Sequence, residues 1–344
     1  MQSRRTLLKS ATALVAALSL AAPAIAETNE PLAVVATFSI LGDMVERIGG
    51  DHVAVTTLVG PDGDAHVYQP TPAAARAVSE AEVLVVNGLD FEGWLDRLID
   101  ASDFNGARVV AAEAVEPIAY EDDHEEHTEA ESHDHDDHDH EEAVEAATHD
   151  HDDHHDHHAE AGHDHHHHGA FDPHAWQSLE NAVVYVDTIT AALAQADPDN
   201  AGTFYQNRAS YVAEIEALDA EIREIVADLP ASRRTIVTSH DAFQYFGRDY
   251  GLTFLAPQGL STDSEASAQE VARLIEEIRE HNISAVFVEN IADSRLLEQI
   301  ADETGATIGG TLYPGALSGP DGPAPTYLDM MRHNPTTLAQ ALGS

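Results

Sequence analysis

Three histidines that lie far apart along the chain each occupy a setting that suits a metal ligand. His66 lies in a loop rich in Gly, Pro and Asp, and His240 directly follows an expected strand at 234–239. His174 follows Pro173, whose ring fixes φ and restricts the residue before it, so we expect the local backbone to aim this imidazole. Three neutral imidazoles suit Zn²⁺, with copper or nickel competing on affinity, whereas manganese and magnesium prefer more oxygen. The sequence therefore predicts a transition-metal site at these histidines.

Alternating strand and helix patterns are expected to position the three histidines. Apolar runs predict strands in the first part of the chain, at 32–38, 52–59, 82–87 and 107–111. After two helical patterns at 178–196 and 200–229, further strands are predicted at 234–239, 252–256, 285–288 and 306–311. This rhythm predicts an α/β fold of two doubly wound lobes joined by a long bridging helix. Ligands of such sheets bind beyond the carboxyl ends of the strands, which places the metal site in the cleft between the lobes.

The expected organisation has four parts. Residues 1–26 form a signal peptide, 27–176 the N-terminal α/β lobe, 177–230 the bridging helices and 231–344 the C-terminal α/β lobe, whose last helix is expected after Pro335. An insertion at 120–169 in the N-terminal lobe holds 17 of the 23 histidines and 20 of the 62 acidic residues. Because it has almost nothing to bury, we expect a disordered His/Asp/Glu-rich loop. A solvating acidic tail would not need so many histidines, so we expect this loop to collect metal.

The charge of the chain excludes several classes of partner. Sixteen Lys and Arg stand against 62 Asp and Glu, which gives a formal net charge of −46. Nucleic acids and anionic membrane surfaces need basic residues, so neither is an expected partner, whereas cations are. The remaining histidines lie at the edges of expected elements and are interpreted as structural or solvent-exposed: His52, His281 and His333.

The first 26 residues predict export. A basic stretch at 3–9 precedes an apolar run at 11–22 and a small-residue cleavage site at 24–26. The paired arginines leave both the twin-arginine and the general secretory route open. The apolar run is short for a transmembrane helix, and the absence of cysteine excludes disulfides, thiolate ligands and a lipid-modified cysteine. We therefore expect a soluble periplasmic protein after cleavage.

Five segments occur in an order and at separations that are specific when taken together. They are Pro61–Pro72, Asp172–Trp176, Thr238–Phe246, Phe287–Glu289 and Tyr327–Met331. Over the whole mature chain this pattern resembles the zinc/manganese solute-binding proteins of bacterial ABC importers. The resemblance implies two lobes bridged by a helix, with a metal ion between them held first by His66, His174 and His240. Manganese-binding members place a glutamate at the third position, so His240 implies Zn²⁺ as the transported ligand.

The fourth ligand position departs from the family pattern. Members of this type carry an Asp in the loop after the last strand, where this chain has Gly315. Glycine has no side chain with which to coordinate, so a water molecule, Asp64, Asp241 or a residue of the insertion remain candidates, and we favour water. Asp241 begins an expected helix, where its negative charge is stabilising without a metal. The loss of a charged ligand is expected to weaken binding or to speed release.

The resemblance implies the periplasmic component of a high-affinity importer that captures Zn²⁺ and delivers it to the transmembrane subunit of an ABC permease, without catalysis. A periplasmic metallochaperone is a further candidate partner, and we expect a monomer. Binding needs deprotonated imidazoles, so affinity should fall below about pH 6.5. One alternative is a zinc-dependent hydrolase, since three His and a water also describe catalytic zinc, with Glu289 or Asp241 as general base. Another is a stand-alone periplasmic zinc buffer.

Overall fold

The structure is a computed structural model that describes residues 30–120 and 170–343. The predicted signal peptide and positions 121–169 of the predicted histidine-rich loop lie outside the described residues. Within these two ranges, no helix combines the length and the apolarity needed to cross a lipid bilayer.

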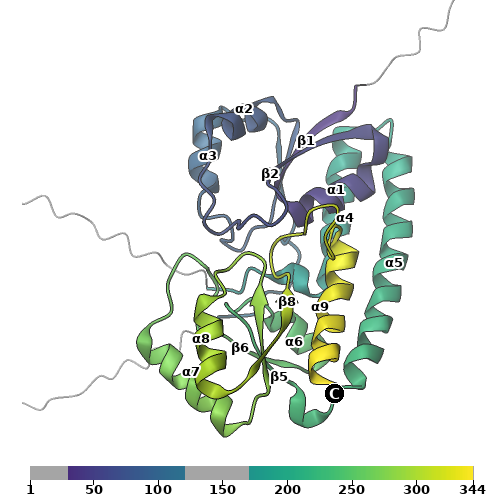
Figure 1. The fold of residues 1–344 in the computed structure, drawn as a ribbon. Helices are drawn as coiled ribbons and strands as arrows, with labels where there is room; N and C mark the ends of the chain where they lie inside the picture. Colours follow the sequence, from purple (N-terminus) through teal and green to yellow (C-terminus); the bar gives the residue numbers. More distant parts are fainter. Residues whose placement is uncertain (1–29, 121–169, 344) are drawn as a thin grey trace, which may run out of the picture. The chain divides into compact units, whose positions relative to one another are not determined.

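The first sheet has four parallel strands in the order β2-β1-β3-β4 (Figure 1). The strands are β1 (Leu32–Phe38), β2 (Val53–Val59), β3 (Val83–Val86) and β4 (Ala107–Val110). The connecting helices are α1 (Ser39–Gly49), α2 (Pro72–Glu80) and α3 (Leu95–Ser102). β3 is buried along its whole length, as an inner strand of a parallel sheet should be. α2 begins where the side chain of Thr71 accepts a hydrogen bond from the Ala74 amide and a proline takes the first helical position.

The second sheet repeats the same arrangement, with four parallel strands in the order β6-β5-β7-β8. Its strands are β5 (Thr235–Val237), β6 (Thr253–Leu255), β7 (Ala285–Glu289) and β8 (Thr307–Leu312). Its helices are α6 (Gln244–Tyr250), α7 (Ala268–Glu280), α8 (Arg295–Thr304) and α9 (Tyr327–Leu342). The order in which strands are added reverses between β1 and β3 in the first sheet and between β5 and β7 in the second. Open α/β sheets bind ligands beside such a reversal. The predicted pair of doubly wound α/β lobes is confirmed.

Successive residues of β5 and β7 pack into two different apolar cores. Val237 and Val286 belong to a small core shared with α7 and α8. Ile236, Ala285 and Phe287 belong to a larger core that includes α6, α9 and the first sheet. Because neighbouring side chains of a strand point to opposite faces, helices must cover both faces of the second sheet.

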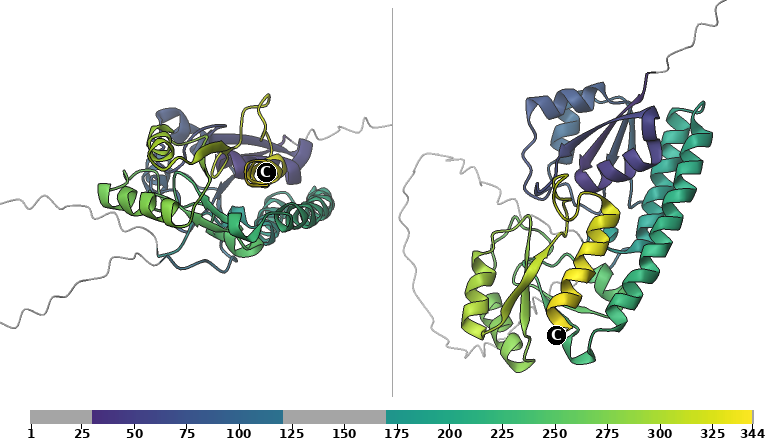
Figure 2. Two further views of the ribbon diagram at one scale, coloured as in Figure 1. Left: turned by 60° about the horizontal axis from the view of Figure 1, so that its bottom comes forward. Right: turned by 45° about the vertical axis from the view of Figure 1, so that its right-hand side comes forward.

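Two long helices lie between the sheets in sequence: α4 (Leu179–Ala196) and α5 (Ala201–Ala227). They pack against each other and lie side by side in the structure (Figures 1 and 2). At 1.5 Å per residue, α5 is about 40 Å long. It contacts α1 beside the first sheet and α6 and α9 beside the second, so one rigid element touches both lobes.

The last helix begins earlier than the sequence predicted. α9 contains Pro335, whereas a helix was expected only after this proline. Its start is fixed by the Thr326 hydroxyl, which accepts from the Asp329 amide at 3.2 Å, and by Asp43 of α1, which accepts from the Tyr327 amide at 3.0 Å. α9 also packs against β8 and α5. These caps and contacts outweigh the one backbone hydrogen bond that a proline removes from a helix.

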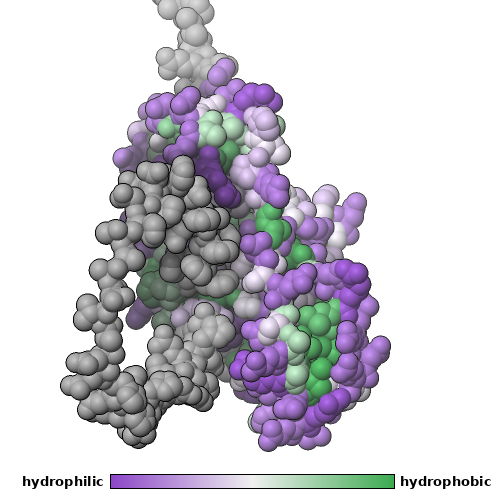
Figure 3. Space-filling view, turned by 90° about the vertical axis from the view of Figure 1, so that its left-hand side faces the viewer, coloured by the Kyte–Doolittle hydropathy of each residue, from purple (hydrophilic) through white to green (hydrophobic). Residues whose placement is uncertain are grey.

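Hydrophilic side chains make up most of the described surface on the face drawn in space-filling form (Figure 3). Apolar side chains also reach this face in several places, the clearest of them low on the face (Figure 3). The hydrophilic majority agrees with a chain in which acidic residues greatly outnumber basic ones.

Candidate metal centre

The fold brings the three predicted histidines together. One ring nitrogen from each of His66, His174 and His240 lies within 4.8 Å of the other two. His174 and His240 are completely buried, and His66 is half-buried. The three residues follow different elements, since His66 comes after β2, His240 comes after β5, and His174 precedes a short turn of helix that leads into α4. Convergence at one point therefore depends on the tertiary fold and not on local sequence.

The loop that carries His66 is held by its own backbone and by the second lobe. Asp64 Oδ1 accepts a hydrogen bond from the His66 amide at 2.9 Å, and the Trp94 indole donates to the Ala65 carbonyl at 2.8 Å. From the second lobe, Thr262 Oγ1 donates to Asp64 Oδ2 at 2.5 Å. The His66 ring packs edge-on against Phe91, with the ring centroids 4.7 Å apart. These contacts limit the positions that the His66 ring can take.

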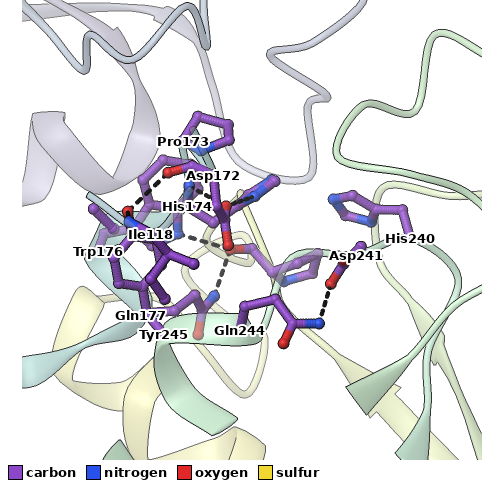
Figure 4. Close-up of polar contacts among 12 residues, drawn as sticks. Ile118, Asp172, Pro173, His174, Trp176, Gln177, His240, Asp241, Gln244 and Tyr245 are labelled. Atoms are coloured by element: carbon purple, nitrogen blue, oxygen red, sulfur yellow. Dashed lines mark hydrogen bonds and ion pairs between the residues drawn. The ribbon is translucent and has the colours of Figure 1, made fainter. Parts of the chain in front are cut away.

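A buried carboxylate orients His174. Asp172 Oδ1 lies 2.9 Å from the His174 amide and 2.8 Å from His174 Nδ1, so one oxygen accepts both hydrogen bonds (Figure 4). This arrangement assigns the proton to Nδ1 and leaves the Nε2 lone pair free. Nε2 lies 3.3 Å from His66 Nε2. Two nitrogens bound at about 2.0–2.1 Å to a tetrahedral zinc ion would lie about 3.3–3.4 Å apart, so this separation fits a shared metal.

A second buried carboxylate orients His240. Glu289, the last residue of β7, lies with Oε2 2.5 Å from His240 Nδ1, while its Oε1 accepts from the amides of Ser239 and His240 at 2.9 and 3.2 Å. His240 Nε2 is buried and has no hydrogen-bond partner among the described residues. A buried polar atom without a partner costs free energy unless something else binds it. A buried nitrogen without a partner, in a ring that belongs to the group of three histidines, fits a metal ligand.

The electrostatic environment differs among the three rings. Burial holds the pKa of His174 well below its ordinary value, and the charge of His240 lowers it further. The pKa of His66 is lowered for the same reasons, with an added contribution from His174. Burial alone would also lower the pKa of His240, but the Glu289 carboxylate raises it above its ordinary value. His66 and His174 are therefore held neutral, as ligands must be, whereas His240 is the ring that competes most strongly for a proton.

The acidic candidates for a fourth ligand already accept hydrogen bonds from other groups. Both oxygens of Asp64 accept hydrogen bonds, from the His66 amide and from Thr262. Asp241 accepts from the Gln244 side chain at 2.6 Å (Figure 4). Within residues 30–120 and 170–343, no carboxylate oxygen joins the group formed by the three histidines. The described part of the chain thus offers three nitrogen donors at this site.

Gly315, the residue that the resemblance assigns to the fourth position, lies next to Ile291 and Trp176. A Cβ added there would meet Ile291 Cδ1 at 3.7 Å and Trp176 Cζ2 at 3.8 Å, which are ordinary contact distances. The Trp176 ring in turn packs against His174, with the centroids 5.3 Å apart. The indole of Trp176 and the amide of Gln177 both donate to the Pro314 carbonyl, at 2.8 and 2.6 Å, and hold this loop in place (Figure 4).

Sequence reasoning did not assign the two carboxylates that orient the rings. Asp172 lies two residues before His174, and a histidine that follows Asp-Pro is a local signal for such a pair. Glu289 was considered only as a general base, although a glutamate that ends an apolar strand next to the strand before His240 was a signal for contact. Asp241, which was expected to begin a helix, lies before α6 and accepts a hydrogen bond from Gln244, the first residue of that helix. The other three histidines outside the insertion take no part in this group.

Comparison with known proteins places the chain among metal-binding proteins. A family model described as zinc-uptake complex component A, periplasmic, matches residues 34–341. The manganese-binding lipoprotein MntA of Bacillus subtilis is 31% identical over 319 residues, which cover 91% of this chain and 90% of MntA. The iron-binding protein YfeA of Yersinia pestis is 30% identical over 317 residues, which cover 92% of this chain and 88% of YfeA.

Solved structures agree with the sequence comparison. The periplasmic zinc-binding protein TroA from Treponema pallidum superposes with a TM-score of 0.74 at 26% identity, covering 92% of this chain and 100% of TroA. A manganese-bound variant of the periplasmic metal-binding protein from Candidatus Liberibacter asiaticus gives a TM-score of 0.72 at 30% identity, covering 91% of this chain and 100% of that protein.

These relatives bind metal ions and are not catalytic enzymes, which confirms the expectation that the chain is not an enzyme. The metals in their names differ, since manganese, iron and zinc all occur. The two solved structures share the fold of this chain and are named as periplasmic, and MntA is named as a lipoprotein. On the extent of the family match and the agreement of fold, this chain belongs to the zinc-uptake complex component A family of periplasmic metal-binding proteins.

Proposed function

We propose that this protein captures Zn²⁺ in the periplasm as the binding component of an ABC importer and delivers it to the membrane permease, with His66, His174 and His240 as ligands. The observation that carries the proposal is the group of three ring nitrogens within 4.8 Å of one another. In two of the rings, Nδ1 is held by a buried carboxylate, so Nε2 is the nitrogen left to bind. Relatives named as ABC transporter substrate-binding proteins support the transport role.

The donor set favours zinc over the other metals in the relatives' names. Zinc accepts three imidazoles and one further ligand in a tetrahedron, whereas manganese prefers carboxylate, carbonyl and water oxygens. The three described donors at this site are all nitrogens. The 3.3 Å between the Nε2 atoms of His66 and His174 already matches a tetrahedral ion, and His240 needs only a small approach to complete the group. A modest closure on binding would supply that approach.

Water is the fourth ligand that we propose. Gly315 contributes no donor, and the oxygens of Asp64 are already used by other hydrogen bonds. Three neutral imidazoles and a water leave the zinc charge uncompensated in the inner sphere, so the carboxylates of Asp172 and Glu289 compensate it through the rings. A site of this kind should release zinc faster than one that holds a coordinated carboxylate.

The hydrolase alternative lacks a free general base. Glu289 accepts hydrogen bonds at both oxygens, from two amides and from His240 Nδ1. Asp241 is engaged with the side chain of Gln244. Because both carboxylates already accept hydrogen bonds, neither is favoured as the base that a zinc-bound water would need within hydrogen-bond reach.

Zinc titration should separate this site from the many histidines of the insertion. In a chain lacking residues 121–168, we expect one tightly bound Zn²⁺, and His240→Ala should weaken its binding more than about 100-fold, since removal of an orienting partner alone typically costs 10- to 100-fold. Calorimetry with a competing chelator measures this affinity. The control is His281→Ala, an exposed histidine outside the group, which should bind as the parent does. Loss of all tight binding on deletion would instead support a zinc buffer.

Restoring a carboxylate at position 315 should strengthen the site. Gly315→Asp has room for its Cβ beside Trp176, whose ring packs against His174, and we expect its carboxylate to reach the metal. We expect a Kd for Zn²⁺ at least about tenfold lower, or about 1.4 kcal/mol, together with slower release to a chelator in stopped-flow measurements. Gly319→Asp adds the same charge to the same loop where nothing lies within 4 Å of the new Cβ. Equal effects of the two changes would show that general charge, not coordination, is responsible.

Zinc affinity should begin to fall at a higher pH than for an ordinary histidine site. The raised pKa of His240 means that a proton competes for its Nε2 already above about pH 6.5, so affinity is full above that pKa and is lost as pH falls through it. Because the pKa values of His66 and His174 are lowered, protons compete with zinc for these two rings only at lower pH. Glu289→Gln removes the charge that raises the pKa, so the fall should move to lower pH. Affinities measured by chelator competition from about pH 8 to about pH 5.5 test this, and an unmoved profile in Glu289→Gln contradicts it.

A further inference from the structure

We propose that Tyr245 is a positioning residue for the metal centre, and that its hydroxyl holds the backbone of Asp172 so that the Asp172 carboxylate can aim His174. The inference rests on the proposed zinc site. It assigns a role to a residue of α6 that contacts Asp172 and not the histidine rings themselves. It follows from a continuous series of hydrogen bonds of 2.8 to 3.1 Å, of which the one from the Ile118 amide is part-buried and the others are buried.

The Tyr245 hydroxyl makes two hydrogen bonds at once. It donates to the Asp172 carbonyl at 2.9 Å and accepts from the Ile118 amide at 3.1 Å (Figure 4). The side chain is completely buried, and burial raises the pKa of Tyr245 to about 12, so the hydroxyl keeps the proton that it donates. The guanidinium of Arg248 lies over the ring, 5.2 Å from its centroid, and helps to hold the ring in place. Removing the hydroxyl alone would leave both backbone groups without this partner.

The position of the Asp172 backbone affects the orientation of the His174 ring through the Asp172 carboxylate. Its Oδ1 takes both the amide and the Nδ1 hydrogen bonds of His174, whereas its Oδ2 is buried and has no partner among the described residues. Nothing in the described structure therefore anchors the carboxylate group from its other side. A shift of the Asp172 backbone would turn the carboxylate and, with it, the His174 ring.

The same hydroxyl ties together the two ends of the insertion. Ile118 and Asp172 lie on opposite sides of residues 121–169, and the Asp172 amide donates to the Ile118 carbonyl at 2.9 Å. An isolated bridge pairs Ala119 with Phe171 next to them. Tyr245 contacts this short ladder from α6, the helix that follows His240 in the chain. The segments that carry His174 and His240 are thus held to one common element.

The other end of the His174 segment has separate anchors. The Tyr327 hydroxyl donates to the Trp176 carbonyl at 2.7 Å, and the side chains of Trp176 and Gln177 bind the Pro314 carbonyl. These contacts hold the chain after His174. Tyr245 holds the chain before it, so its loss should change the orientation of the ring more than the overall fold.

The test compares two tyrosines on the same helix. Tyr245→Phe removes only the hydroxyl and keeps the ring under Arg248. Tyr250→Phe is the matched control. The Tyr250 hydroxyl donates to Asp219 Oδ1 of α5 at 2.8 Å, and Asp219 is not one of the residues that hold the histidines. Both variants lose one buried hydroxyl donor and should lose a similar amount of thermal stability. Zinc affinity by chelator competition, thermal unfolding and the visible absorption spectrum of the Co²⁺ form are measured on the full chain.

We expect Tyr245→Phe to bind Zn²⁺ about five- to tenfold more weakly than the parent, with an altered Co²⁺ spectrum, and Tyr250→Phe to match the parent in both. If Tyr245→Phe keeps the parent's affinity and spectrum, the inference is overturned while the proposed zinc site stands. If the parent chain itself shows no tight zinc site, both are overturned. The two failures are therefore distinguishable.

A measurement on the unaltered chain decides the matter if Tyr245→Phe does not fold. Coupling between sites is reciprocal, so zinc held through His174 and Asp172 should stabilise the hydrogen bond between the Ile118 amide and the Tyr245 hydroxyl. Hydrogen exchange at the Ile118 amide should therefore be slower in the zinc-loaded protein than in the metal-free protein. Equal exchange rates in the two states would overturn the inference.

Discussion

Hydrogen bonds between buried carboxylates and histidine Nδ1 atoms are the interactions on which the proposed site depends. Asp172 and Glu289 each fix the tautomer and the direction of one ring, so that Nε2 points toward a common centre. Both carboxylates are buried, where an ion without partners would be costly. Backbone amides supply part of the compensation for each, and zinc polarising the rings would supply more. The site is thereby aimed before a metal arrives.

This orientation has a function only if the two lobes are held at a suitable separation. Asn290 Nδ2 of the second lobe donates to Asp62 Oδ1 at 3.0 Å, and the Asp62 amide donates to the Leu317 carbonyl at 2.8 Å. α5 contacts helices beside both sheets over its length. Together these contacts favour small movements over a wide opening in the proposed capture and release of zinc.

Sequence patterns predicted most of the fold, because strand and helix periods and short loops are local properties. Which three histidines meet was predicted from their places after expected strands and from the family resemblance, since their convergence is not a local property. The start of α9 was missed because Asp43, far away in the sequence, caps it. The roles of Glu289 and Tyr245 were missed for the same kind of reason, since each acts on a residue that only the tertiary fold brings near. Gly315 shows the converse, because a departure visible in the sequence falls at a position beside Trp176 where the structure has room for a Cβ.

The most direct test of the account is a crystal structure of the zinc-loaded chain lacking residues 121–168, with the metal located by anomalous scattering at the zinc edge. The account predicts a single strong peak about 2.0–2.1 Å from Nε2 of His66, His174 and His240, with one further oxygen ligand that does not come from a described side chain. A peak elsewhere in the chain, or one bound by fewer than three of these nitrogens, would contradict it.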